Sequence, residues 1–377
     1  MEKIISDFLE MVQADAISFD ERKVADIVKG KLEELGCTDI YEDDAGSKIG
    51  GNTGNIFARL KGELPGSIMF SAHMDRMPNG FGIKPVIENG VISTGGTTIL
   101  AADDLGGVAA ILDGVRRLKD SGKPHCTVEI LFTVSEEKGL LGSLHFDYSD
   151  VKSTIAYALD SPGHIGRILV SAPYSARISC EVFGKAAHAG SEPEKGISAA
   201  MGAARILASL KEGRLDEEST ANFPIVRAGG DATNAVCDHA LIKGEARSRN
   251  KQKLLDYLEY FEKHCNEEAA AFGVTVKVES ALGSPGFNVP KDSASVSLIS
   301  KVFGKMGITA NPEPSGGGMD ANRFNYNGLE SVGLATGYFD NHTTNEHVVV
   351  EDLIRSGEMV YETVMEYSAD PAAYTVK

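Results

Sequence analysis

Two runs of consecutive apolar, β-favouring residues constrain the fold of this chain more than any other feature. They are Val128-Glu-Ile-Leu-Phe-Thr-Val134 and Thr154-Ile-Ala-Tyr-Ala-Leu159. Such runs fit strands that are buried on both faces, as in a sheet with helices on either side. Strand patterns at Ile56–Leu60 and Ser67–Ser71 and a helical pattern from Val108 to Leu118 alternate around them. The alternation predicts an α/β fold.

The pattern changes in the middle of the chain, between residues 174 and 283. Here a strand, a helix, two strands, a long helix at Lys251–Phe272 and a last strand follow one another. The order β-α-β-β-α-β is that of a ferredoxin-like module. In the long helix, Leu254, Leu255, Leu258 and Phe261 are expected on one buried face. We therefore expect an inserted α+β domain at residues 174–283, within a larger domain of residues 1–173 and 284–377 that has a mixed central sheet flanked by helices.

Composition excludes several classes of protein. The 377 residues include 54 Asp plus Glu against 37 Lys plus Arg, and the formal charge of -17 argues against nucleic acid as a partner. The five cysteines are scattered and odd in number, which is typical of free thiols in a reducing compartment. The N-terminus shows no signal peptide pattern and no run of 18 apolar residues occurs, so we expect a cytoplasmic protein without a membrane span.

Five short segments, each placed where a strand is expected to end, carry residues that bind metals well. Together they supply two imidazoles and several carboxylates, which is what a pair of zinc ions needs. Glu136 adds a free carboxylate that could act as a general base. The metal-binding candidates are His73, Asp103, Glu137, Asp160 and His342, and Asp75 is a second acid in the segment of His73.

Each of these segments also has an ordinary structural explanation. Asp is favoured at helix N-caps and at the start of turns, and paired acids are common in solvated loops. The alternatives are a surface pair for His73 and Asp75, an N-cap for Asp103, a solvated pair for Glu136 and Glu137, a turn for Asp160, and His347 in place of His342.

The five segments, in this order, resemble the two-zinc peptidases that include peptidase T, carnosinase, carboxypeptidase G and succinyl-diaminopimelate desuccinylase. The resemblance runs through nearly the whole chain. It is strongest to peptidase T-like tripeptide aminopeptidases, through the segments Ser135–Gly142, Ser315–Asn322 and His342–Glu346.

This resemblance implies a role for each candidate. One zinc would be held by His73 and Asp160, the second by Glu137 and His342, and Asp103 would bridge both. Glu136 would be the catalytic base, and Asp75 would orient the His73 ring. The resemblance also implies a cis peptide bond between Asp103 and Asp104, which is rare outside proline.

The resemblance places further substrate groups in the inserted domain, which would serve as a lid and a dimerisation surface. His188 would stabilise the oxyanion across a homodimer, and Asn234 and Arg247 would hold a substrate carboxylate. Their structural alternatives are a turn histidine, a loop asparagine and an edge-strand arginine. Two positions depart from the family pattern: Leu105 stands where many relatives have lysine, and Met319 where serine is common.

The expected function is that of a metallo-aminopeptidase, which uses two Zn²⁺ per chain, or Co²⁺ or Mn²⁺, to hydrolyse the N-terminal bond of short peptides, tripeptides foremost. An N-acyl amino acid deacylase or a dipeptidase would use the same site. Alternatives outside catalysis are a binding protein that kept the fold and a single structural metal site.

Overall fold

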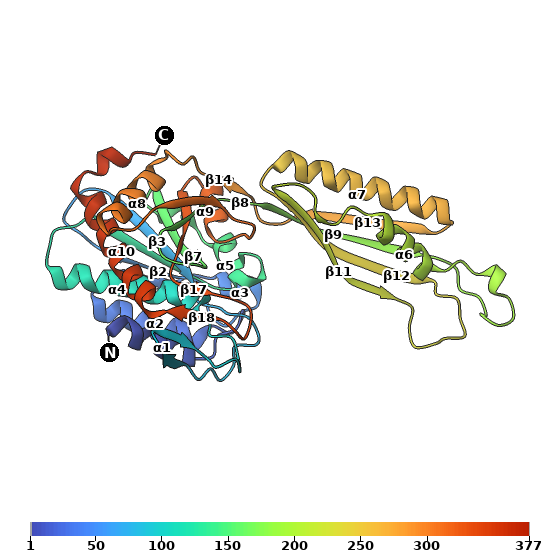
Figure 1. The fold of residues 1–377 in the computed structure, drawn as a ribbon, viewed down its shortest axis with the longest axis horizontal. Helices are drawn as coiled ribbons and strands as arrows, with labels where there is room; N and C mark the ends of the chain where they lie inside the picture. The colour runs from blue at the N-terminus through green and yellow to red at the C-terminus, as the bar shows by residue number, and fades with distance from the viewer. Residues whose placement is uncertain (1, 377) are drawn as a thin grey trace. The chain divides into compact units, whose positions relative to one another are not determined.

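The computed structural model describes residues 2–376, and the chain divides into two compact units (Figure 1). The first unit runs up to Ala172 and resumes at Phe287, and the second is Pro173–Gly286. The expected insertion, residues 174–283, falls inside the second unit. Each unit has its own hydrophobic core.

The first unit is built on a mixed sheet in the order β1-β2-β6-β3-β7-β16-β8-β14, with β15 also paired to β8. The central pairs β6–β3, β3–β7 and β7–β16 are parallel, whereas β1–β2 and β2–β6 are antiparallel. The mixed α/β sheet expected from the sequence is confirmed. Its strands are β1 (Thr38–Glu42), β2 (Ile56–Leu60), β3 (Ser67–His73), β6 (Thr127–Thr133), β7 (Ile155–Ser161), β8 (Arg167–Ala172), β14 (Phe287–Asn288), β15 (Asn311–Pro314) and β16 (Glu330–Ala335).

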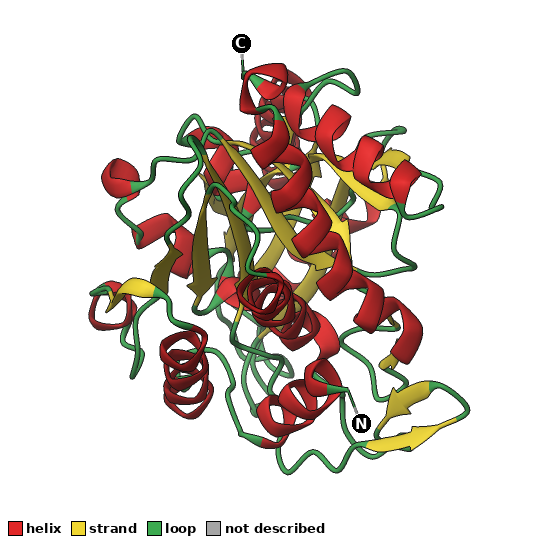
Figure 2. Cartoon of the chain, turned by 90° about the vertical axis from the view of Figure 1, so that its left-hand side faces the viewer, coloured by secondary structure: helices red, strands yellow, loops and turns green. Residues whose placement is uncertain are grey.

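Helices lie on both sides of this sheet (Figure 2). They are α1 (Lys3–Gln13), α2 (Arg22–Leu35), α3 (Ala45–Ile49), α4 (Ala102–Ser121), α5 (Leu141–His145), α8 (Ala294–Lys305), α9 (Ala321–Tyr326) and α10 (Val350–Ala369), with short 3-10 turns η1 (Glu136–Lys138), η2 (Tyr148–Asp150) and η4 (Pro371–Tyr374). A small separate sheet has the order β17-β18-β5-β4. Its strands are β4 (Val86–Glu88), β5 (Val91–Ser93), β17 (Tyr338–Phe339) and β18 (His347–Val349).

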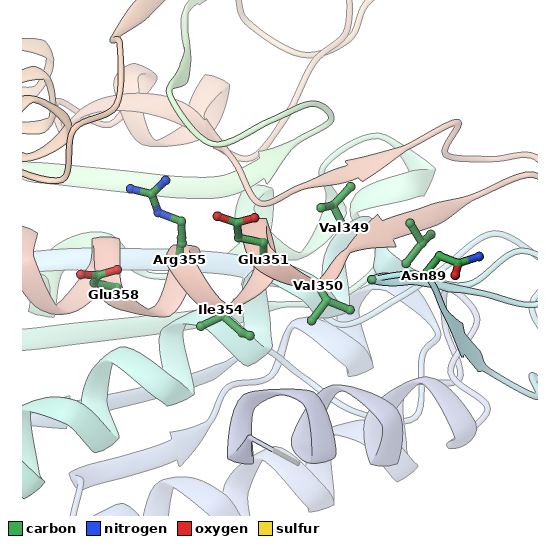
Figure 3. Close-up of a pocket in the computed structure, with 9 residues that line it drawn as sticks. Asn89, Val349, Val350, Glu351, Ile354, Arg355 and Glu358 are labelled. Carbon is green, nitrogen blue, oxygen red and sulfur yellow. The ribbon is translucent and has the colours of Figure 1, made fainter.

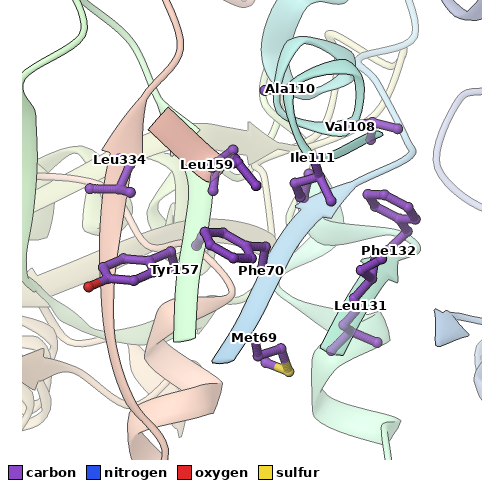
Figure 4. Packing of buried hydrophobic residues seen from close by; sticks show 14 of the residues in the cluster. Met69, Phe70, Val108, Ala110, Ile111, Leu131, Phe132, Tyr157, Leu159 and Leu334 are labelled. Carbon is purple, nitrogen blue, oxygen red and sulfur yellow. The ribbon is translucent and has the colours of Figure 1, made fainter. Parts of the chain in front are cut away.

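The core of this unit explains why its central strands read as continuous apolar runs. Every residue of β3 is buried, and so is all of β6 after its first residue, because side chains on both faces pack against other elements. Figure 4 shows Val108 and Ile111 of α4 above the strands that carry Phe70 and Leu159. The rings of Phe70 and Tyr157 stack with centroids 5.8 Å apart. This packing fixes where the central strands end.

The second unit is a ferredoxin-like module, as expected. Its sheet order β10-β11-β12-β9-β13 places the first long strand between the third and the fourth. Leu255 is a correction: it was expected on the buried face of α7 but is 36% exposed, while Leu254 and Phe261 are buried. The elements are β9 (Tyr174–Phe183), η3 (Pro193–Lys195), α6 (Ala199–Ser209), β10 (Gly213–Arg214), β11 (Ser219–Ala228), β12 (His239–Ser248), α7 (Lys251–Phe272) and β13 (Thr275–Leu282).

Across residues 2–376, no helix is both long enough and apolar enough to cross a membrane.

Candidate metal centre

The candidate ligands meet because three neighbouring strands run parallel. His73 is the last residue of β3, Glu136 and Glu137 follow β6, and Asp160 lies near the end of β7. The strands β6, β3 and β7 are adjacent and parallel, so their carboxyl ends share one edge of the sheet. Ligands of open α/β sheets bind at this edge. Residues that are far apart in the sequence therefore lie close together at this edge.

Asp103 lies between the two imidazoles of the cluster. Its Oδ1 is 3.1 Å from Nε2 of His73, and its Oδ2 is 3.3 Å from Nε2 of His342. His342 Nε2 is also 2.9 Å from Oε1 of Glu137. Asn341 Nδ2 donates to Asp103 Oδ2 at 2.6 Å. A carboxylate with one oxygen toward each imidazole is arranged to contact two cations at once.

Two groups of side chains have ligand atoms close enough to share one ion each. In each group the candidate ligand atoms all lie within 4.8 Å of one another. The groups are His73 with Asp104 and Asp160, and His73 with Asp103 and Glu137. Asp160 Oδ1 also accepts a hydrogen bond from the Tyr338 hydroxyl at 3.1 Å. All five expected ligands thus lie in the same part of the first unit.

Asp104 takes the helix-capping role that the structural alternative gave to Asp103. Asp104 Oδ1 accepts from the amide of Gly107 in the first turn of α4, at 3.2 Å. Its Oδ2 accepts from the backbone amide of His73, also at 3.2 Å. Asp103 instead points to the histidines and has no capping bond. The peptide bond between the two aspartates is cis, which confirms that expectation.

Electrostatics show why cations fit this cluster. Burial, followed by the charge of Asp103, raises the pKa of Asp160 to about 8. Burial likewise raises the pKa of Glu136 well above its ordinary value, although His73 opposes the shift. Asp103 and Glu137 raise the pKa of His342 to about 10. Burial and crowding that raise the pKa of neighbouring acids oppose their negative charge, and a divalent cation removes that opposition.

The charge balance within the cluster points the same way. Among the described residues, the ion pairs of Asp103 and Glu137 are made with histidines and with neither lysine nor arginine. Oxygen and imidazole donors of this kind suit zinc and related divalent ions. The residues present therefore fit the group that the sequence predicted.

Asp75 is fully buried and holds the histidine and the loop after β6 at once. His73 Nδ1 lies 3.0 Å from the backbone oxygen of Asp75 and 3.4 Å from its Oδ1. Asp75 Oδ1 accepts from the amide of Glu136 at 2.9 Å, and Oδ2 from that of Glu137 at 3.3 Å. The contact to Nδ1 leaves Nε2 of His73 directed at the cluster, which is the expected orienting arrangement.

The remaining candidates lie in the second unit. His188 and Asn234 are on neighbouring segments, where the amide of Ala189 donates to the Asn234 carbonyl at 2.9 Å. His188 is exposed, and its Nδ1 accepts from the amides of Gly190 and Ser191, both at 3.2 Å. Two donors to Nδ1 leave the ring proton on Nε2. His188 can therefore offer an N–H bond to an anion.

Arg247 is on β12 and is paired with Glu245 two residues earlier on the same strand. Its Nη2 donates to Oε2 of Glu245 at 3.1 Å, and its Nε lies 3.0 Å from Oε1. The Arg247 side chain is 35% exposed. A guanidinium has five N–H donors, so this pair leaves donors for a further carboxylate.

Three residues that bond the aspartate ligands directly were not expected from the sequence. Glu346 accepts from the backbone amides of Leu100, Ala101 and Asp103, while Tyr338 and Asn341 bond Asp160 and Asp103. Asn341 and Glu346 flank His342 in the segment that carries the resemblance, which was a usable signal. Nothing in the sequence marks Tyr338.

Two other features lie apart from the cluster. His347, the rival to His342, stacks on Phe339 at 5.4 Å and contacts the Asn345 carbonyl. A surface pocket of about 610 Å³ lies between the β4–β5 turn and the start of α10, lined among others by Asn89, Glu351 and Arg355 (Figure 3). The pocket shares no residue with the cluster, and it holds no comparable set of metal donors.

Fold and site together define a metal-dependent hydrolase, with clustered ligands at the carboxyl edge of an α/β sheet and an adjacent free carboxylate. Residues 69–366 match the model of peptidase family M20/M25/M40. The chain belongs to this family and is a peptidase.

Three relatives are similar to this chain along nearly their whole length. The Bacillus subtilis (strain 168) protein YqjE is 40% identical over 365 residues, which cover 97% of this chain and 98% of that protein. The crystal structure of aminopeptidase PepT from Bacillus cereus ATCC 10987 has 37% identity and a TM-score of 0.89, with 98% of both chains covered. A tripeptidase from Staphylococcus aureus subsp. aureus Mu50 has 32% identity and a TM-score of 0.93, again with 98% of both chains covered.

Proposed function

We propose that the protein is a two-cation aminopeptidase that removes the N-terminal residue of short peptides, tripeptides foremost. The observation that carries the proposal is the placement of Asp103 between His73 and His342, with Glu137 and Asp160 on either side. The similarity to an aminopeptidase and to a tripeptidase supports the choice of substrate.

His73 and Asp160 would hold one cation, Glu137 and His342 the other, and Asp103 would contact both. We propose Zn²⁺ as the metal, because it accepts imidazole and carboxylate ligands and leaves positions open for substrate; Co²⁺ or Mn²⁺ would use the same donors. When bound, such ions lower the pKa of water toward about 7 and polarise a carbonyl.

Glu136 would act as general base and then as general acid. Its backbone amide is fixed by Asp75, so the side chain projects from an immobile point beside the ligands. It would take a proton from the attacking water and deliver that proton to the departing amine. No side-chain nucleophile is needed.

The groups of the second unit would bind the substrate. The Nε2–H of His188 would donate to the oxyanion, and the remaining donors of Arg247, together with Asn234, would hold the C-terminal carboxylate. We propose that the enzyme is a homodimer in which His188 acts on the site of the other chain, and that the inserted domain is both lid and dimer surface. All five cysteines are free, which supports a cytoplasmic enzyme.

A pair of neighbouring variants tests the site. Glu136→Gln should keep two cations per chain and lose at least about a thousandfold in kcat, since it removes the proton carrier. The matched control Glu137→Gln should instead lower the cation content. Metal would be counted by mass spectrometry of the metals and amine release measured on tripeptides. An active Glu136→Gln enzyme would disprove the assignment of the base.

The substrate class is tested by comparing tripeptides, dipeptides and N-acyl amino acids with metal-stripped and zinc-restored enzyme. Cleavage of tripeptides alone, and only with metal, is the expected result. Preferred cleavage of dipeptides or N-acyl amino acids would agree with the proposed site residues but contradict the assignment to the tripeptide aminopeptidases. Metal binding without any cleavage would indicate a binding protein.

Action of His188 across the dimer has its own test. A mixture of inactive His188→Ala and Glu136→Ala chains should recover activity, because some mixed dimers contain one site with both residues intact. Exchange of subunits would be verified with differently tagged chains. Exchange without recovery would contradict the proposal.

A further inference from the structure

The segment Ser135–Glu137 carries both the proposed base and a proposed ligand, and buried carboxylates hold each of its backbone amides. The amide of Ser135 donates to Oε1 of Glu21 at 2.9 Å. The next two amides donate to Asp75, as described above. Two carboxylates from distant parts of the chain therefore fix three successive peptide units at the edge of the site.

Glu21 makes more than one contact with this segment. Its Oε1 also accepts from the hydroxyl of Ser135 at 3.0 Å and from the amide of Phe19 at 3.1 Å. The amide of Phe19 in turn donates to Oγ of Ser135 at 3.1 Å. Ser18, in the same loop between α1 and α2, donates to Oδ2 of Asp75 at 2.6 Å. The loop at Ser18–Glu21 thus holds the segment Ser135–Glu137 through Glu21. The same loop also supports Asp75, the other carboxylate that binds this segment.

The clamped backbone does not adopt an ordinary conformation. Ser135 has φ of 50° and Phe19 has φ of 75°, both in the left-handed region that residues other than glycine rarely occupy. Such a residue persists only where the surroundings hold it. The bonds that Ser135 donates to Glu21 belong to the surroundings that hold this conformation.

The burial of Glu21 is costly for a merely structural residue. The residue is fully buried, and its Oε2 has no hydrogen-bond partner. Within residues 2–376 it forms no salt bridge, whereas the equally buried Glu129 pairs with the Arg59 guanidinium and also accepts from the backbone amides of Lys152 and Ser153. A buried acid without a cation opposes folding. A buried acid at this position therefore indicates a role other than stabilising the fold, and its contacts point to the segment Ser135–Glu137.

We propose that Glu21 is a positioning residue of the reaction, which fixes Glu136 and Glu137 relative to the cations through its bonds to Ser135. The inference rests on the proposed function, since it assigns Glu136 and Glu137 their roles. It assigns Glu21 no contact with substrate. A displacement of about 1 Å at reacting groups can lower a rate by about a hundredfold, so loss of the clamp acts mainly on kcat.

The test compares Glu21→Ala and Glu21→Gln in the full chain restored with zinc. The alanine variant removes all three bonds to Oε1 and should lower kcat by about 10- to 100-fold, with KM changed by less than about threefold. The glutamine variant keeps an oxygen acceptor at the same place, so its kcat should stay within about threefold of wild type. Zinc affinity, measured by competition with a chromogenic chelator, should fall in the alanine variant because Glu137 is on the same segment.

Glu129→Ala is the matched control. Glu129 is also fully buried, and its Oε2 accepts from the amide of Ser153 at 2.8 Å and from its hydroxyl at 2.7 Å, the same kind of pair that Glu21 makes with Ser135. Its removal should destabilise the fold and leave kcat per folded chain and zinc affinity near wild type. Equal losses of kcat in the two variants would reduce Glu21 to a general structural role and overturn the proposal.

Two further measurements keep the outcome clear. If Glu21→Ala does not yield folded protein, Ser135→Ala removes the hydroxyl bond to Glu21 and the bond that Oγ accepts from the Phe19 amide. It should lower kcat by about 3- to 10-fold at unchanged KM; an unchanged kcat would overturn the proposal. Glu136→Gln is measured in parallel. An active Glu136→Gln enzyme refutes the proposed base, while wild-type kcat and zinc affinity in Glu21→Ala refute the positioning role.

Discussion

Removal of the Glu346 carboxylate should destabilise the first unit more than any surface change. Glu346 is 1% exposed, and its Oε2 accepts from the amides of Leu100 and Ala101 at 2.8 and 2.9 Å. Its Oε1 accepts from the amide of Asp103 at 3.0 Å. One side chain thus satisfies three donors at the turn that enters α4.

The magnitude follows from those bonds. Glu346→Ala leaves three N–H groups without an acceptor, and each buried unsatisfied group costs about 1–3 kcal/mol. Water that enters the space of the side chain recovers part of this, so we expect a loss of about 3–5 kcal/mol. Glu346→Gln keeps one oxygen acceptor and turns its amide NH2 group, itself a donor, toward the remaining backbone N–H, so its loss should be about 1–3 kcal/mol.

The assay is urea unfolding in the presence of a chelator, which removes the contribution of bound cations. The chain has no tryptophan, so far-UV circular dichroism is the appropriate signal. Hydrogen exchange at Leu100, Ala101 and Asp103 should accelerate in the alanine variant. Glu351→Ala, at an exposed position in the first turn of α10, is the control and should change stability by less than about 0.5 kcal/mol. An alanine variant within about 1 kcal/mol of wild type, or one more stable than the glutamine variant, would refute the reasoning.

Three further predictions concern packing, pH and metal. Gly114→Ala should lower the free energy of unfolding by about 2–3 kcal/mol, because its Cβ would lie 2.3 Å from Val360 Cγ1 and push α4 away from α10. Gly30→Ala is the control: a Cβ there has nothing within 4 Å, so it should not destabilise the fold. Urea unfolding of both variants checks the prediction. The Arg22 guanidinium holds the pKa of Glu42 at about 2, below the ordinary glutamate value of 4.5. This pair therefore stabilises the fold above pH 4.5, and its contribution is lost as the pH falls toward 2. With Arg22 35% exposed, screening reduces the effect to about 1–2 kcal/mol; the stability difference between wild type and Glu42→Gln should shrink over that range, and a constant difference would contradict it. Removing the metal with a chelator should lower the free energy of unfolding of the wild type by about 2.7 kcal/mol if the metal had been present at a hundred times its dissociation constant. The same treatment should change the unfolding free energy of Asp103→Asn much less, as urea unfolding with and without the chelator would show.

Much of the fold followed from periodicity alone. The apolar runs became β6 and β7, and Lys251–Phe272 became α7 with the expected bounds. The misplacement of Leu255 shows the limit of such patterns, because adjacent helical residues point in different directions and in α7 the core covers Leu254 but not Leu255. The capping role considered as the structural alternative for Asp103 falls to its neighbour: either of two adjacent aspartates could cap α4, and only the surroundings made it Asp104.

The sequence by itself determined the elements and the residues at their ends, because hydrophobic periods and strand-end acids are local properties. The strand ends put Asp160 at the carboxyl edge of the sheet, and the resemblance grouped it with His73 and Glu137; the parallel pairing of β6, β3 and β7 brings them together. Only the tertiary structure decided which residues support them. Glu21 reaches Ser135 across 114 positions and Glu346 reaches Asp103 across 243. Such contacts depend on how distant loops pack together, and no short window of sequence contains both partners.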